Sequence, residues 1–144
     1  MKQFERSLPM MLYKTLDVVM PQFRAIYSEY GITEQQWRVL RVLWEHESMP
    51  LLELADITLI SAPSLVGIID RLGNVEMVKR VRSELDRRVV FIEITAKGKA
   101  LKEKVSPRVD AIYARLEDSI DAEVWASMLE GMNKIIANKG KVLG

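Results

Sequence analysis

The sequence predicts a mainly α-helical protein with one small β-hairpin, built as a single domain over residues 1–144. Through most of the chain apolar residues recur every three or four positions, which is typical of amphipathic helices. Between residues 78 and 94 this spacing changes to alternation, which is typical of paired strands. With 49% apolar and 28% charged residues, the chain has the composition of a folded domain with one core.

The first predicted helix covers residues 8–30 and carries one apolar stripe. The stripe consists of Leu8, Leu12, Leu16, Val19, Phe23, Ile26 and Tyr30. Gly31 supplies the stop signal, since glycine is common directly after a helix end. Thr33 and Gln36 then form a capping box, which predicts the start of a second helix.

The second helix also has a hydrophobic staple at its start, formed by Ile32 and Trp37. Its apolar face continues through Leu40, Leu43 and Trp44. Pro50 ends the pattern, because proline disfavours helical geometry in the residue before it. A short third helix should then turn its apolar residues inward: Leu51, Leu54, Ala55 and Leu59.

The fourth predicted helix separates a core face from a small, polar face. Ser61 is its expected cap, Pro63 suits its first turn, and Gly73 closes it. The core face consists of Leu65, Ile68, Ile69 and Leu72. The opposite face consists of Pro63, Ser64, Val66, Gly67, Asp70 and Arg71.

A β-hairpin with a basic tip is predicted next. Val90, Ile92 and Ile94 alternate with their neighbours, and residues 78–81 form a shorter partner strand. Residues 79–88 hold five basic and two acidic residues, a net charge of +3 in a chain whose formal net charge is +1. Such a local positive field attracts a polyanion, although a solvated charged loop would account for it equally well.

Two further helices complete the chain. Thr95 ends the second strand and is placed to cap a long helix, which Pro107 should kink. Asp121 begins a final helix, with Ile120 and Trp125 as a second staple. Its apolar stripe consists of Trp125, Met128, Leu129, Met132, Ile135 and Ile136.

Three helices followed by a hairpin, over residues 32–95, have the order of a winged helix-turn-helix. In that fold helix 62–72 lies in the DNA major groove and the hairpin tip reaches a neighbouring minor groove. Small side chains let the helix approach the bases, and Ser61 and Ser64 at its start can bond phosphates or base edges. A protein-interaction module, or one that binds DNA without sequence preference, is the alternative.

The remaining helices, residues 7–30 and 96–140, are not needed to complete this trihelical core. Their apolar faces either cover one another within the monomer or interlock with a second copy. We favour a homodimer, because one reading helix and one wing rarely bury enough surface for site-specific binding. The dimer would place two reading helices about 34 Å apart on a palindromic operator in double-stranded DNA.

The composition argues against catalysis and against a metal or cofactor site. The chain has no cysteine and one histidine, His46, which we expect at the surface near a helix end. It contains no phosphate-binding glycine loop, no HExxH pattern and no Ser/His/Asp constellation. No apolar run approaches the ~20 residues of a membrane span, and residues 1–6 do not lead into a signal peptide. We therefore expect a cytoplasmic protein that is not an enzyme.

Five segments carry a resemblance to a known family: Ile32–Leu40, Glu53–Ala55, Asp70–Leu72, Asp86–Arg88 and Ile94–Gly98. In this order and spacing the chain resembles the MarR (multiple antibiotic resistance regulator) family over nearly its whole length. The resemblance implies a homodimeric regulator that represses, less often activates, an operon by binding a palindrome. It also implies that a small, often phenolic, ligand binds in a cleft between the DNA-binding lobe and the dimer helices and releases the protein from DNA.

The residues and the resemblance together indicate a DNA-binding set in the fourth helix and the wing. The set consists of Ser61, Ala62, Pro63, Ser64, Gly67, Arg71, Arg82, Arg87 and Arg88. Arg88, or its neighbour Arg87, would sit in the minor groove, whose narrow A·T tracts favour guanidinium groups. The resemblance implies that Asp86 orients the wing. Asp70 is expected to form a salt bridge instead of a DNA contact, because phosphate repels its carboxylate.

A closer likeness is to the subgroup of that family that regulates homoprotocatechuate (4-hydroxyphenylacetate) degradation, and it is carried by Ser7–Pro9, Glu34–Arg38 and Pro63–Gly67. Leu16 and Ala62 stand where that subgroup carries arginine. The likeness implies a repressor of an operon for aromatic catabolism, with other phenolic or drug-like effectors as the alternative.

An aromatic acid would be held by residues on the helices that line the expected ligand cleft. These residues are Met10, Lys14, Trp37, Arg38 and Arg41. The alternative is that the tryptophan belongs to the core and that the arginines are solvated or bind phosphate.

Overall fold

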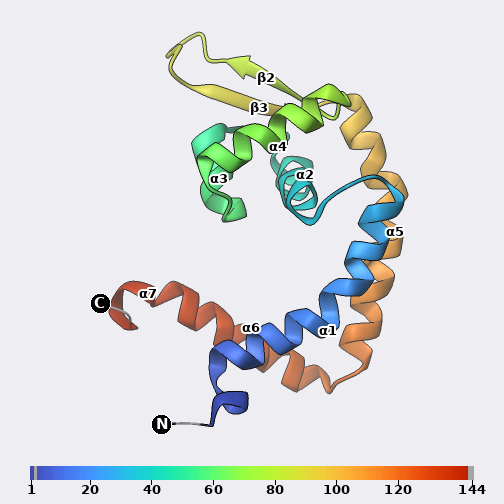
Figure 1. The fold of residues 1–144 in the computed structure, drawn as a ribbon, viewed down its shortest axis with the longest axis vertical. Helices are drawn as coiled ribbons and strands as arrows, with labels where there is room; N and C mark the ends of the chain where they lie inside the picture. Colours follow the sequence, from blue (N-terminus) through green and yellow to red (C-terminus); the bar gives the residue numbers. More distant parts are fainter. Residues whose placement is uncertain (2, 143–144) are drawn as a thin grey trace. The chain divides into compact units, whose positions relative to one another are not determined.

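The computed structural model describes Met1 and residues 3–142 (Figure 1). In chain order the elements are the 3-10 helix η1 (Phe4–Arg6), α1 (Leu8–Glu29), α2 (Glu34–His46), β1 (Ser48–Pro50), α3 (Leu51–Thr58), α4 (Ala62–Asn74), β2 (Val78–Arg82), β3 (Val90–Ile94), α5 (Ala96–Asp118), α6 (Ala122–Ala137) and α7 (Lys139–Val142). The predicted fold class, mainly helical with a small β wing, is therefore confirmed. The short helix α7 was not predicted.

The chain divides into two compact units, Met1–Pro107 and Arg108–Gly144. Helix α5 is continuous through the boundary, which falls at the proline that the sequence places inside this helix. A kink at Pro107 stays a prediction. Among the described residues no single helix is long and apolar enough to cross a membrane; only α3 and α4 taken together reach that length and composition, and they are bent by 105°.

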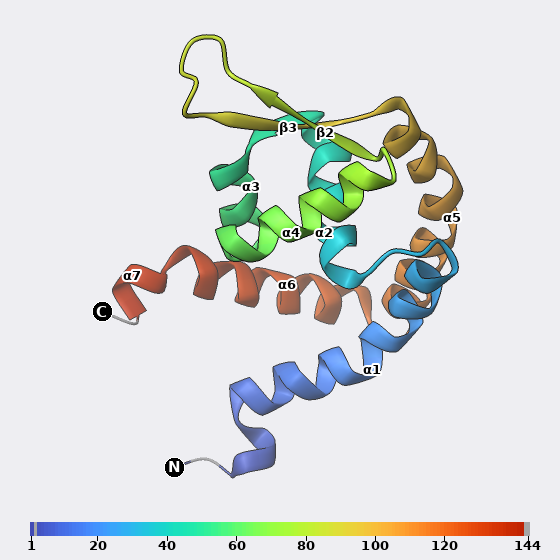
Figure 2. The same cartoon turned by 45° about the horizontal axis from the view of Figure 1, so that its top comes forward.

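The core of the first unit lies among α2, α3, α4, the sheet and the part of α5 that belongs to this unit. Its fully buried side chains are Val39, Leu40, Leu43, Leu54, Leu65, Ile68, Ile69, Ile92 and Val105. Figure 2 shows β2 and β3 running across one side of this helix cluster, with the loop that joins them projecting beyond the helices. The predicted core face of α4 is confirmed, since all four of its residues are at most 2% exposed.

The four predicted N-terminal helix caps are all present, but the prediction that Gly73 closes α4 is wrong, because the helix continues through Gly73 to Asn74. Thr33 and Gln36 form both hydrogen bonds of the capping box, at 3.1 and 3.0 Å. The hydroxyl of Ser61 accepts from the Ser64 amide at 3.3 Å, and that of Thr95 accepts from the Gly98 amide at 3.1 Å. The carboxylate of Asp121 likewise accepts from the Glu123 amide at 2.8 Å. Gly31 ends the turn after α1 with φ +67°, a conformation that suits glycine.

The sheet has a third strand that the sequence did not predict. Its order is β1-β3-β2, and both pairings are antiparallel. Met49 of β1 lies opposite Ile92 of β3 and is buried. The strand is only three residues long and includes Pro50, which lacks an amide hydrogen, so it shows no alternating pattern of its own.

The prediction that Leu59 faces inward is wrong: its side chain is 86% exposed. Helix α3 ends at Thr58, and Leu59 follows it in the left-handed conformation, with φ 56°. This conformation turns the chain, so that the next residue, Ile60, is buried instead. The spacing of the apolar residues does not show that the helix ends before Leu59.

The long apolar stripe of α1 is only partly covered within its own unit. Phe23, Ile26 and Tyr27 are buried, whereas Leu8, Leu12 and Leu16 are exposed. In the second unit, α6 has no buried residue although it carries the predicted apolar stripe. Both helices therefore present apolar side chains to the surroundings.

Candidate nucleic-acid interface

Helix α4 presents the predicted small and polar residues on its outer face. Ser61, Pro63, Ser64 and Arg71 are exposed, and Ala62 and Gly67 are half-buried. The hydroxyls of Ser61 and Ser64 lie 2.9 Å apart at the start of the helix, where unsatisfied amides add positive potential. The guanidinium of Arg71 lies 3.8 Å from the position that a Cβ on Gly67 would occupy, so this cation lies along the same face.

In the wing, which is the hairpin of β2 and β3 with its connecting loop, Asp86 fixes the direction of the Arg88 side chain. Oδ1 of Asp86 accepts from the amide and from Nε of Arg88, each at 3.1 Å, and Oδ2 accepts from Nη2 at 3.2 Å. The Arg88 side chain, followed by its amide, keeps the pKa of the Asp86 carboxyl below its ordinary value. Because the Arg88 side chain is 90% exposed, its guanidinium keeps free donors for a ligand outside the protein.

The other two predicted wing arginines differ in their surroundings. Arg82 donates from Nη1 to the carbonyl oxygen of Arg87, so its guanidinium holds the two sides of the hairpin together. Arg87 is exposed and has no ion-pair partner in the part of the chain that the structure describes. The wing therefore offers Arg87 and Arg88 to a polyanion, while Arg82 has a structural contact.

Asp70 forms a salt bridge, as predicted, and its partner is Arg80. Nη2 of Arg80 on β2 lies 2.6 Å from Oδ1 of Asp70 on α4, and it also donates to the carbonyl of Val66 at 3.3 Å. The guanidinium of Arg80 therefore connects α4 to the wing. Sequence reasoning did not single out Arg80, and its position on a strand next to two other basic residues gave no signal of this role.

The five predicted effector residues differ in their surroundings, and a shared ligand site for them stays a prediction. Trp37 is buried and stacks on Tyr27 with ring centroids 4.5 Å apart, so it belongs to the core. Nη1 of Arg38 donates to the carbonyl of Thr58 at 2.7 Å, and its Nε is buried without a hydrogen-bond partner among the described residues. Arg41 pairs with Glu45 at 3.0 Å. Met10 is half-buried and Lys14 is exposed on α1.

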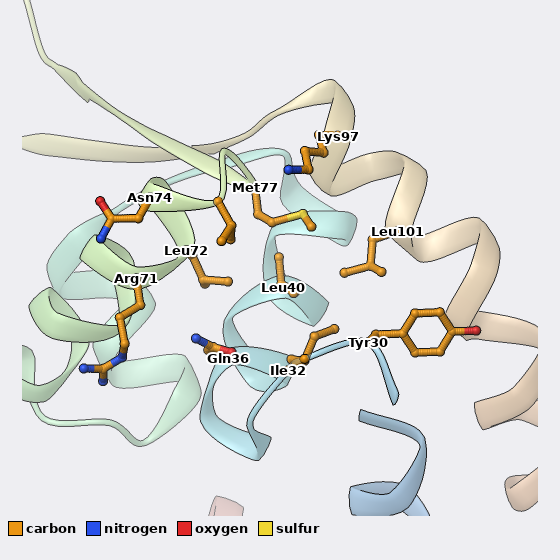
Figure 3. Close-up of a pocket in the computed structure, with 12 residues that line it drawn as sticks. Tyr30, Ile32, Gln36, Leu40, Arg71, Leu72, Asn74, Met77, Lys97 and Leu101 are labelled. Atoms are coloured by element: carbon orange, nitrogen blue, oxygen red, sulfur yellow. The ribbon is translucent and has the colours of Figure 1, made fainter. Parts of the chain in front are cut away.

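A cavity of about 600 Å³ lies in the first unit, behind the C-terminal end of α4 (Figure 3). It is lined by Tyr30, Gly31, Ile32, Gln36, Leu40, Arg71, Leu72, Asn74, Val75, Met77, Lys97 and Leu101. Of the predicted site residues it includes Arg71 alone. His46 is exposed at the end of α2, as expected, and no group of three or more potential metal ligands occurs among the described residues.

Comparison with known proteins identifies the family. A family model for the transcriptional regulator SarA/Rot matches residues 22–105. The HTH-type transcriptional regulator FarR of Neisseria gonorrhoeae is 34% identical over 117 residues, 81% of this chain and 80% of FarR. The homoprotocatechuate degradative operon repressor of Escherichia coli is 32% identical over 131 residues, 91% of this chain and 88% of that repressor. The crystal structure of NadR in complex with 4-hydroxyphenylacetate matches with a TM-score of 0.81 and 31% identity, covering 94% of this chain and 96% of NadR.

A trihelical unit with a polar reading face and an arginine-bearing wing defines a winged helix-turn-helix protein. The matched relatives of this chain are transcription regulators. The chain belongs to the MarR family of winged-helix transcription regulators, so the resemblance of its sequence is confirmed.

Proposed function

We propose that this regulator binds palindromic operator DNA as a homodimer and that an aromatic acid releases it. The proposal of DNA binding rests on one observation, namely that the first unit combines a polar helix face with an exposed arginine on the wing. Helix α4 exposes the hydroxyls of Ser61 and Ser64, and the wing exposes Arg88 in a direction fixed by Asp86. The helix would read the major groove through residues 61–71, and Arg87 and Arg88 would enter the minor groove.

A dimer is supported by the apolar residues that each unit leaves exposed. Helix α1 exposes Leu8, Leu12 and Leu16, and α6 exposes Leu129 and Ile136. Contiguous apolar side chains of this kind are usually covered by a partner. A second copy would cover them and would supply the second reading helix, with residues 7–30 and 96–140 as the dimerisation region and residues 32–95 as the DNA-binding lobe.

The proposed effector is a phenolic carboxylate similar to 4-hydroxyphenylacetate. NadR has been crystallised with that compound, and the relative from Escherichia coli represses homoprotocatechuate degradation. The expected ligand residues are Met10, Lys14, Trp37, Arg38 and Arg41, of which Lys14 and Arg41 are exposed cations able to meet a carboxylate. A cytoplasmic location, where operator DNA is found, follows from this function.

The test is a fluorescence anisotropy titration of labelled DNA from the gene's own upstream region, at physiological salt, against a scrambled duplex of equal length. We expect tight binding to the upstream duplex alone, with two chains per duplex. Adding 4-hydroxyphenylacetate should release the DNA, whereas 2-(4-hydroxyphenyl)ethanol, which keeps the phenol but lacks the carboxylate, should not. Equal, weak and strongly salt-dependent binding to both duplexes would instead show a DNA-binding module without sequence preference.

A further inference from the structure

The cavity behind the reading helix has the dimensions and walls of a ligand pocket. Its volume of about 600 Å³ lies within the usual range for such pockets, roughly 300–1,000 Å³. Figure 3 shows the side chains of Leu40, Leu72 and Met77 converging on one space from α2, α4 and the segment before β2. Apolar side chains therefore line one part of a volume large enough for a small organic molecule.

The charged side chains that line this cavity are all positive. Its lining includes two cations, Arg71 and Lys97, and no carboxylate. In Figure 3 the amine of Lys97 is turned toward Met77, while Arg71 lies at the other end beside Gln36. Lys97 has no ion-pair partner among the residues that the structure describes, whereas Lys99, on the same turn of α5, pairs with Glu47 at 2.9 Å. The N-terminus of α5 adds further positive potential beside Lys97.

The cavity is separate from the predicted effector residues. Gln36 and Leu40 line it and lie one turn apart on the same face of α2. At 3.6 residues per turn, Arg38 and Arg41 lie about 200° and about 140° around the helix from Gln36. A ligand in the cavity would therefore contact the other side of α2.

We propose that this cavity binds a small amphipathic carboxylate as a second ligand site. The apolar part of the ligand packs against Leu40, Leu72 and Met77, and its carboxylate meets the amine of Lys97. Such a ligand would touch the last turn of α4 and the first turn of α5 together. The proposal concerns binding to the free protein, so it does not depend on whether the chain reads an operator.

The test uses 2-naphthoate as the probe and 2-naphthamide as its uncharged counterpart. Protein labelled with ¹³C in its methionine methyl groups is titrated without DNA, and the signal of Met77 is assigned from a Met77→Leu variant. We expect a saturable shift of the Met77 signal with 2-naphthoate and at least tenfold weaker binding of the amide. Met10, in the predicted effector set, should shift with a different dissociation constant or stay unchanged.

Three variants complete the test. Lys97→Gln should weaken 2-naphthoate binding about tenfold, because a charge-assisted hydrogen bond is lost. Lys104→Gln, on the same helix and exposed outside the cavity, should leave it unchanged. Val75→Trp places a large ring at the exposed rim and should abolish binding while the other methionine signals keep their positions. Equal binding by Lys97→Gln, equal binding of the amide, or no shift of Met77 would each overturn the proposal.

Discussion

Arg80 on β2 and Asp70 on α4 form an ion pair, with 2.6 Å between Nη2 and Oδ1. The same guanidinium donates to the carbonyl of Val66, one turn earlier on α4. This contact fixes the wing relative to the reading helix. We therefore expect this contact to control whether α4 and the wing can meet adjacent grooves of one duplex at the same time.

Asp70→Asn should lower the ratio of operator to scrambled-duplex affinity, because the wing loses its ionic contact with α4. Binding to the scrambled duplex should rise, since one negative charge near DNA is removed. The free energy of unfolding should fall by at most about 1 kcal/mol, because both side chains are about half exposed. Anisotropy titrations measure the ratio. Asp17→Asn, the same charge change on α1, should leave the ratio unchanged; an unchanged ratio in Asp70→Asn would rule out the positioning role.

Arg88→Ala should weaken operator binding by about 1–3 kcal/mol if its guanidinium enters the minor groove. The loss should be greatest for operators whose flanks are A·T-rich, because the minor groove is narrower and more negative there. Anisotropy with two operators that differ only in these flanks measures both effects. Arg6→Ala removes one positive charge outside the proposed interface and serves as the control. Unchanged operator affinity in Arg88→Ala would remove this residue from the interface.

The carboxyl of Asp86 should titrate below its ordinary pKa of 3.8, since the Arg88 side chain and then its amide donate to it. A lowered folded-state pKa means that the contact contributes fully above the ordinary pKa. Its contribution is lost as the pH falls through the lower, folded-state pKa. NMR titration of the carboxyl carbon should show that Arg88→Ala raises the pKa of Asp86 toward 3.8 without restoring it fully, because the amide of residue 88 still donates to the carboxylate, and that Arg87→Ala leaves the pKa as low as in the unmodified protein. A normal pKa in the unmodified protein would contradict this contact in solution.

Gly98→Ala should lower the free energy of unfolding by about 1–3 kcal/mol. A Cβ at this position would overlap the carbonyl oxygen of Met77 and the side chain of Ile94, where α5 starts close to the sheet. The movement of the backbone that relieves this overlap would also disturb the buried hydrogen bond, 2.9 Å long, that Trp44 Nε1 donates to the Gly98 carbonyl. Urea unfolding measures the change. Gly131→Ala, in α6 with nothing within 4 Å of the new Cβ, should instead raise stability by about 0.5–1 kcal/mol.

Leu59→Gly should raise the free energy of unfolding by up to about 1 kcal/mol. Leucine at φ 56° carries the steric cost of the left-handed conformation, and its exposed side chain contributes little burial. The greater freedom of glycine in the unfolded chain reduces this gain. Leu52→Gly, an exposed position inside α3, should instead lower stability by about 1 kcal/mol. A loss in Leu59→Gly similar to that in Leu52→Gly would show that Leu59 is not strained.

Within the proposed DNA interface, the sequence identified the exposed face of α4 and the wing arginines because each depends on local spacing. Residues 61–71 expose their polar side chains because Leu65, Ile68 and Leu72 turn the other face into the core. The sequence did not distinguish the role of Arg82 from that of Arg88. Arg82 donates to the Arg87 carbonyl, whereas Asp86 directs Arg88 outward. Both are arginines in one basic loop, and only their partners separate their roles.

The sequence by itself determined the helices, their caps and the hairpin, because the groups that form them lie within a few residues of one another. Thr33 and Gln36, or Thr95 and Gly98, meet whenever the chain begins a helix. Only the tertiary structure decided the contacts between distant segments. These contacts are the pairing of β1 with β3, the bond from Arg80 to Asp70 and the walls of the cavity. They depend on how the helices pack, and packing is set by the shape of the whole core, which no local spacing encodes.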